Sequence, residues 1–201
     1  MSILYLFWAF LGQAILGIII TGLNKLGLTG VWLDYVPTII VSILYFIGFM
    51  NLEKVNPQFA KGKPFAIMAA VLAMIQIFLP DQTNVLPLPW WFTIISLAVI
   101  IADLFIIYTV CKGIGELAEA QDLPDFKKVS YQRWIIYVCN QILALAVLAI
   151  SAFVSSTSTG SLVMLAGLLG IVYVVFGLLV YILMATFIWK AHQLLDIKSE
   201  G

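Results

Sequence analysis

The sequence predicts an all-α membrane protein, a single domain over residues 1–201 in which six transmembrane helices form a bundle. Composition is the first observation behind this prediction: 63% of residues are hydrophobic and only 10% are charged, whereas a soluble domain carries roughly 25% charged residues. Secondly, apolar runs long enough to cross a hydrocarbon core of about 30 Å recur along the chain. Finally, the basic residues gather in alternate intervals between these runs, as in polytopic membrane proteins.

Six stretches have the composition of a membrane-spanning helix, which needs about 20 mostly apolar residues. They are continuous apolar runs without the alternation of a barrel strand, which favours helices over strands. The second and third stretches are short. The sixth would be about 42 Å long as a helix, so we expect it to tilt or to protrude from the bilayer. The predicted spans are residues 3–23, 35–52, 64–79, 90–111, 134–154 and 162–189.

The ends of these spans carry further signals. The first stretch, MSILYLFWAF onward, has no basic residue ahead of it and is too long for a signal-peptide core, so we expect a retained helix. Indole and phenol rings prefer the headgroup level of a bilayer. Trp32 and Tyr35 stand at the start of the second span and Trp90 at the start of the fourth. Trp134 and Trp189 mark the opposite boundary in the fifth and sixth spans.

The distribution of Lys and Arg predicts the orientation. The chain has 10 basic residues, and all except Lys25 lie in the second interval, the fourth interval or the C-terminal tail. With six spans these segments fall on one side of the membrane, which the positive-inside rule makes cytoplasmic. We therefore expect a multi-pass protein of the cell membrane, of the bacterial cytoplasmic type, with both termini cytoplasmic. The basic residues expected to contact lipid headgroups at this face are Lys61, Lys63, Lys127, Lys128 and Arg133.

Two of the basic segments share the pattern Pro-x-Phe-x-Lys, at residues 57–61 and 124–128. Both precede an odd-numbered span, which is compatible with a parallel repeat of a helix-hairpin unit. A basic turn with a proline is also what any loop on this side needs, so duplication and generic loop chemistry stay equal alternatives. For the longer segment, residues 113–134, a solvated charged loop is the first expectation and an interfacial amphipathic helix the second.

Asp103, in VIIADLFIIY, is the acidic residue within a predicted span. Nine residues separate it from Lys112, or roughly 14 Å along a helix, which places it near the middle of the membrane. Ionised side chains at this depth are costly, and they usually face a cavity or a polar partner. Asp103 is therefore expected either at a proton or cation site or in a hydrogen bond that locks two helices together.

The expected partners of Asp103 are amides in other spans. Asn140 and Gln141 lie at a comparable depth, and Gln76 is a further intramembrane polar group. These residues would either line a polar path through the bundle or act as interhelical packing contacts. No basic residue stands inside a span to pair with Asp103, which favours a neutral carboxyl group or a bound cation over a buried salt bridge.

Small residues also recur at helical spacing. Ala66, Ala69 and Ala73 share one face of the third span, and Ala166 and Gly170 form a small-xxx-small pair in the sixth. In lipid such faces allow helices to approach closely, either within the bundle or between separate chains. The expected partners are therefore the lipid bilayer and, through these faces, a second copy or another membrane protein. Nothing in the charge distribution points to nucleic acid.

The sequence carries no Walker loop, zinc-protease helix or nucleophile elbow. His192 is the single histidine and lies outside the predicted spans. We therefore expect no enzymatic activity, no catalytic residue, no metal and no cofactor. Two hypotheses of function remain: a small transport- or channel-like bundle built around Asp103, and a non-enzymatic membrane subunit or assembly partner. An enzyme that acts on lipids is a third hypothesis with less support, because its clustered polar residues are absent from the sequence.

Overall fold

The computed structural model describes residues 2–25, 35–78, 90–157 and 160–195. Within these ranges the chain forms six α-helices and one 3-10 helix, with no strand, which confirms the all-α prediction. The elements are α1 (Ser2–Lys25), α2 (Val36–Leu52), η2 (Pro57–Gly62), α3 (Lys63–Phe78), α4 (Trp90–Ala120), α5 (Pro124–Thr157) and α6 (Gly160–Leu194).

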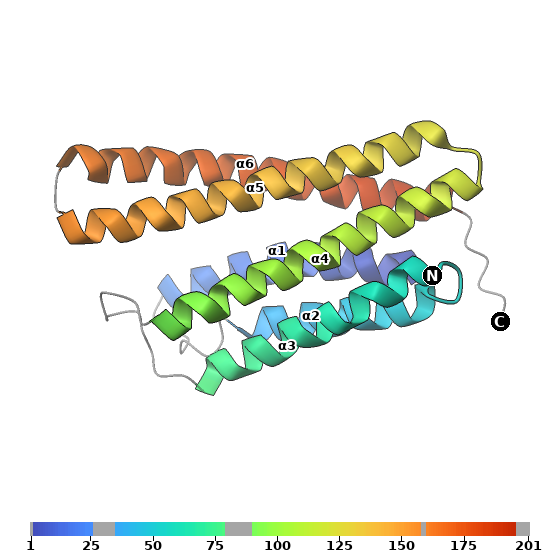
Figure 1. Ribbon diagram of the computed structural model, residues 1–201, viewed down its shortest axis with the longest axis horizontal. Helices are drawn as coiled ribbons and strands as arrows, with labels where there is room; N and C mark the ends of the chain where they lie inside the picture. The colour runs from blue at the N-terminus through green and yellow to red at the C-terminus, as the bar shows by residue number, and fades with distance from the viewer. Residues whose placement is uncertain (1, 26–34, 79–89, 158–159, 196–201) are drawn as a thin grey trace.

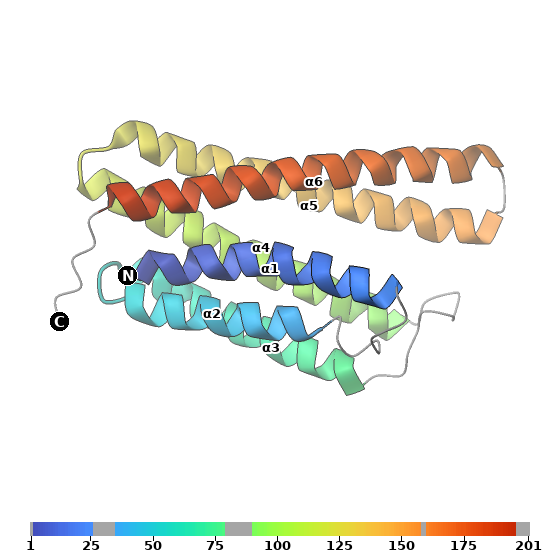
Figure 2. The same ribbon diagram turned by 180° about the vertical axis from the view of Figure 1, so that it is seen from behind.

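The six α-helices form a closed ring of antiparallel neighbours. Each helix packs against the next in sequence, and α6 returns to contact α1. Figures 1 and 2 show the helices at three levels: α5 and α6, then α1 and α4 one behind the other, then α2 and α3. The N-terminus, η2 and the turn between α4 and α5 all lie at one end of the bundle. We call this the basic end, because the basic residues with described side chains gather there.

The apolar helices support a membrane-embedded protein. Three helical segments in the described part of the chain are long and apolar enough to cross a membrane: Pro57–Phe78, Ile94–Ala120 and Gly167–Leu194. Two shorter apolar helices, Ile3–Leu16 and Val36–Leu52, accompany them. A hydrocarbon core of about 30 Å corresponds to about 20 helical residues, so the three longer segments match this thickness.

The segment between the fourth and fifth spans is helical and not the solvated loop that the sequence suggested. Helix α4 continues to Ala120, beyond the predicted end at residue 111, and α5 starts at Pro124, ten residues before the predicted span. Proline suits the first turn of a helix, where its missing N–H is not needed. The reversal is confined to a tight turn in which Asp122 has a φ of 58°, a conformation that Asp tolerates better than most residues.

Contacts with the rest of the bundle explain why this segment stays helical. The Ser130 hydroxyl donates to the carbonyl oxygen of Cys111, which joins α5 to α4 near the turn. The ring of Phe126 stacks against Phe187 of α6 with their centroids 5.3 Å apart. The segment is thus an extension of the bundle and not an amphipathic helix lying in the membrane interface.

The first basic segment has a different local structure, because its proline opens η2 and not an α-helix. The side chain of Asn56 accepts a hydrogen bond from the Gln58 N–H at 2.8 Å, which caps this short helix. Its Nδ2 donates to Glu116 on α4 at 3.0 Å. Phe59 is fully buried and lies directly over Gly113, where a Cβ atom would come within 2.4 Å of the phenylalanine ring.

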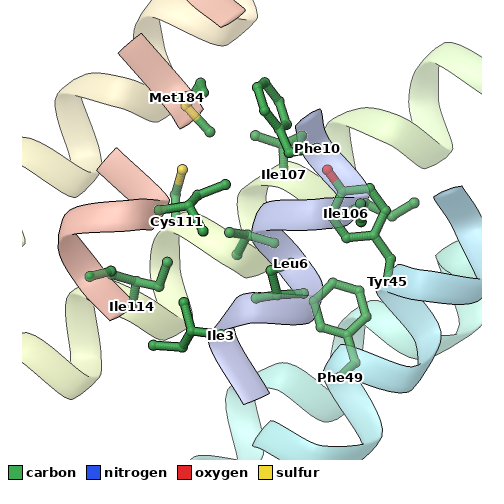
Figure 3. Packing of buried hydrophobic residues seen from close by; sticks show 14 of the residues in the cluster. Ile3, Leu6, Phe10, Tyr45, Phe49, Ile106, Ile107, Cys111, Ile114 and Met184 are labelled. Carbon is green, nitrogen blue, oxygen red and sulfur yellow. The ribbon is translucent and has the colours of Figure 1, made fainter. Parts of the chain in front are cut away.

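The described hydrophobic core lies in the half of the bundle next to the basic end. Figure 3 shows its centre, where side chains from four helices meet. Each helix contributes the half that is nearer this end. The labelled core residues are Ile3, Leu6 and Phe10 of α1, Tyr45 and Phe49 of α2, Ile106, Ile107, Cys111 and Ile114 of α4, and Met184 of α6.

The small-residue faces have different surroundings in α3 and α6. Ala66, Ala69 and Ala73 are buried, so the alanine face of α3 packs inside the bundle as one of the two alternatives predicted. Gly170 of α6 has open space around it, since a Cβ atom built there would meet nothing within 4 Å. The side chain of Ala166 lies outside the described residues.

The basic residues with described side chains all belong to the same end of the bundle. They stand in the α2–α3 connection, in the last turns of α4, in the first turns of α5 and near the end of α6. They are Lys54, Lys61, Lys63, Lys112, Lys127, Lys128, Arg133 and Lys190. The asymmetry expected from the sequence is therefore present in the folded chain.

Candidate functional site

Asp103 faces the interior of the bundle. On α4 it lies one turn before Ile106 and Ile107, which are both buried in the core, and residues three and four apart share a helix face. Ile101 and Phe105 are exposed on the other side of α4. Asp103 is two positions from each of these, or about 200° around the helix. Its carboxyl group therefore points away from the lipid-facing side of the bundle.

The Asp103 carboxyl group accepts hydrogen bonds from α5. The Tyr137 hydroxyl donates to Oδ2 of Asp103, and Gln141 Nε2 donates to the same oxygen at 3.3 Å. Gln141 Nε2 also lies 3.0 Å from the hydroxyl oxygen of Tyr137. Three polar side chains from two helices thus form one closed group, which we call the Asp103 cluster.

Two further phenols approach the cluster from other helices. Tyr45 of α2 and Tyr181 of α6 are both close enough to the Asp103 carboxyl group to interact with it electrostatically. The ring of Tyr181 also packs against Phe10 of α1, with centroids 5.0 Å apart. Side chains of α2, α4, α5 and α6 consequently converge on the same depth of the bundle.

Several buried polar atoms have no hydrogen-bond partner among the described residues. They include Oε1 of Gln13 on α1, the hydroxyl of Tyr45 and Oδ1 of Asn140. A buried polar group without a partner costs about 1–3 kcal/mol, so native structures contain few of them. Tyr45 is the member of this set for which an electrostatic interaction with Asp103 is found.

Asn140 belongs to this region but not to the Asp103 cluster itself. It is buried and faces α6, where its Oδ1 lies 3.6 Å from the place a Cβ atom of Gly177 would occupy. A glycine at position 177 therefore leaves room for the amide between α5 and α6. The sequence placed Asn140 at the right depth, but the helix turns its side chain about 100° away from that of Gln141.

The structure does not bring Gln76 to Asp103. The rings of Phe65 on α3 and Phe105 on α4 stack with centroids 4.4 Å apart, which sets the register of these antiparallel helices. Gln76 is eleven residues beyond Phe65 and therefore level with residue 94 of α4. That position is about 14 Å from Asp103 along the helix axis, so Gln76 does not extend the cluster.

The residues expected to contact lipid headgroups differ in their surroundings. Lys61, Lys127 and Lys128 are exposed at the basic end, and Lys63 forms an ion pair with Glu53 at 2.5 Å. Arg133 differs, because its Nε is buried and has no hydrogen-bond partner in the described part of the chain.

Sequence reasoning missed Tyr137, although a signal was present. Arg133, Tyr137 and Gln141 follow one another at intervals of four residues, which places them in one row along α5. The row connects the basic end with the Asp103 cluster. A search for polar residues at helical spacing would have found it, but tyrosine was counted among the residues that mark membrane boundaries.

Chemically, the cluster can hold a proton or a cation through a carboxylate, hydroxyl and amide oxygens, which are hard ligands. Groups of three or more His, Cys, Asp and Glu suited to a metal ion do not occur among the described residues. Comparisons of the chain with protein-family models, with curated proteins and with solved structures gave no match. The case for a function therefore depends on the geometry of the cluster.

Proposed function

We propose that the protein is a small transport- or channel-like bundle in which Asp103 binds a proton or a monovalent cation. The observation that carries this proposal is the position of the carboxyl group, which faces the bundle interior and receives hydrogen bonds from Tyr137 and Gln141. Acidic side chains within membrane spans typically mark ion pathways or proton relays. Placing such a side chain in the membrane costs free energy, so a position of this kind usually has a function.

Buried oxygen atoms without a hydrogen-bond partner support the same proposal. The buried Oε1 of Gln13 and Oδ1 of Asn140 can only accept hydrogen bonds or coordinate a cation. The Tyr45 hydroxyl can either donate or accept. A site for a hydrated proton or a small cation needs several such groups, and these belong to α1, α2 and α5.

The row of Arg133, Tyr137 and Gln141 supplies a polar connection toward the basic end. The buried Nε of Arg133 lies one turn from Tyr137, at the mouth of this connection. A positive charge there opposes the free entry of cations, so it would slow leakage and favour controlled release of a proton. This role makes Arg133 part of the path and not only a headgroup contact.

The orientation belongs to the same proposal. We place the basic end in the cytoplasm according to the positive-inside rule, with all six helices crossing the membrane and both termini on the cytoplasmic side. A bacterial cytoplasmic membrane suits this arrangement. The Asp103 cluster then lies near mid-membrane, reached from the cytoplasm along α5.

The experiment is a flux measurement on the full chain in liposomes, with a pH-sensitive dye inside and a potassium or sodium gradient imposed. Asp103→Asn keeps the shape of the side chain and removes its charge. We expect it to lower flux by about tenfold or more, since tenfold corresponds to only ~1.4 kcal/mol of lost interaction. Thr109→Val is the matched control, because the Thr109 hydroxyl on the same helix bonds only its own helix at Phe105.

A second candidate function is that of a membrane subunit, in which the Asp103 cluster locks α4 to α5. Its support is that the carboxyl group already has two donors, and that the face of α6 around Gly170 stays open for another chain or a second copy. The same variants separate the candidates. Unchanged flux in Asp103→Asn together with a lower unfolding temperature would remove the transport role and favour the lock.

A further inference from the structure

A cavity of about 340 Å³ lies between α4 and α5 at the basic end. Its volume falls in the range of small-molecule sites, about 300–1,000 Å³. It does not include Asp103 or any residue of the Asp103 cluster, so it is a separate feature of the molecule. The lining residues that matter are Tyr108, Lys112, Glu116, Glu119, Lys127 and Trp134.

The charges around this cavity balance one another. Two lysines and two glutamates line it. Lys127 and Glu119 form an ion pair at 2.6 Å across the α4–α5 turn, with both side chains about half exposed. Glu116 accepts a hydrogen bond from Asn56 of the α2–α3 connection, which holds its carboxylate in place. The cavity therefore presents two positive and two negative side chains within the same small volume.

Aromatic rings form one wall of the cavity. Tyr108 and Trp134 pack edge to face with centroids 5.3 Å apart. The Lys112 ammonium lies over the Tyr108 ring, 5.7 Å from its centroid, which shows that this wall accepts a cation. Rings of this type prefer the level of the lipid headgroups, and the cavity lies at that level if the basic end faces the cytoplasm.

We propose that this cavity binds a phosphate ester that carries a primary ammonium group, the headgroup of a zwitterionic phospholipid. The phosphate would bond to Lys112 and Lys127, and the ammonium group to the carboxylates of Glu116 and Glu119. A zwitterion inserts into a balanced set of charges and leaves none uncompensated. An anionic headgroup would bring its negative charge beside two carboxylates, which is unfavourable in a partly buried site.

The surface beyond the cavity fits the acyl chains of such a lipid. Along α4 toward the opposite end, Phe105 and Ile101 are exposed at intervals of four residues. On α5 the exposed residues Ile135 and Ile142 are seven residues apart, which places them on one side of the helix. The headgroup site thus continues into an apolar stripe, which a soluble compound would not use.

The test is native mass spectrometry of the purified full chain after exchange into phosphatidylethanolamine, phosphatidylcholine or phosphatidylglycerol. We expect retained phosphatidylethanolamine to exceed both other lipids. Lys127→Gln should reduce retention about tenfold, which corresponds to ~1.4 kcal/mol, because it removes one of the two positive groups proposed to bind the phosphate. Lys54→Gln is the control: this lysine is also exposed at the basic end but does not line the cavity.

Lys112→Gln tests the site from α4 and should reduce retention in the same way as Lys127→Gln. Equal retention in the Lys127 and Lys54 variants would overturn the proposal, as would a preference for phosphatidylglycerol. Soluble phosphoethanolamine at millimolar concentration separates the two sources of the headgroup. Weak displacement supports a bound lipid, whereas displacement at equal potency would retain the headgroup chemistry and overturn the role of the acyl chains.

Discussion

The two halves of the bundle differ in how tightly they are packed. Near the basic end, α6 buries Val180, Met184 and Ile188 against its neighbours. Nearer the opposite end, its described residues face outward, and Met164 and Ile171 are 69% and 64% exposed. Figures 1 and 2 show α5 and α6 diverging from α1 and α4 in that direction.

The bundle is therefore packed most tightly at its basic end. The connections at that end form part of the packing, since η2 contributes a fully buried phenylalanine and a hydrogen bond to α4. Between the two halves lies the Asp103 cluster. The cluster thus stands where the tightly packed half gives way to the more exposed half.

Removing the aromatic ring of Phe59 should have the largest effect on the packed half. Phe59→Ala deletes a fully buried ring that lies against Phe49 and Gly113. Substitutions of this kind in a core cost about 3–5 kcal/mol. We expect a large fall in the thermal unfolding midpoint of the detergent-solubilised protein, followed by circular dichroism.

The matched control for this change is Phe78→Ala at the far end of α3, where the side chain is 87% exposed. We expect its unfolding midpoint to stay close to that of the unchanged protein. If Phe59→Ala and Phe78→Ala lowered the unfolding midpoint equally, the two halves of the bundle would not differ in packing.

A pair of glycine substitutions tests the same difference in packing between the two halves. Gly113→Ala places a Cβ atom 2.4 Å from the ring of Phe59, and overpacking of this kind costs about 1–3 kcal/mol. Gly170→Ala meets nothing within 4 Å and replaces a poor helix former, which is worth up to about 1 kcal/mol in stability. The same chemical change should therefore lower the unfolding midpoint at position 113 and leave it unchanged or raised at position 170.

The architecture was largely predictable from the sequence, because apolar runs and basic intervals follow directly from the demands of a bilayer. All six predicted stretches are helices, with ends that agree within a few residues for the first three. The segment after Cys111 was misjudged because charge was taken as a sign of a loop. Charged residues such as Glu116 and Lys127 are good helix formers, and the exposed ones face water without interrupting α4 and α5.

The site was predictable only in part. Asp103 and Gln141 stand out as polar residues at one depth, and the structure brings them within hydrogen-bonding distance. The register between helices was beyond the sequence, since it depends on packing contacts such as the stacked rings of Phe65 and Phe105. That register excludes Gln76 from the cluster.

The smallest expected effect concerns the hydrogen bonds that hold η2 in place. Asn56→Ala removes both the cap to the Gln58 N–H and the bond to Glu116, and the loss of such a cap costs about 0.5–2 kcal/mol. Asn51→Ala, at an exposed position of α2 five residues earlier, is the control and should change little. If the two variants unfold at the same temperature, the Asn56 hydrogen bonds add nothing measurable to stability. The buried ring of Phe59 would then hold η2 in place without them.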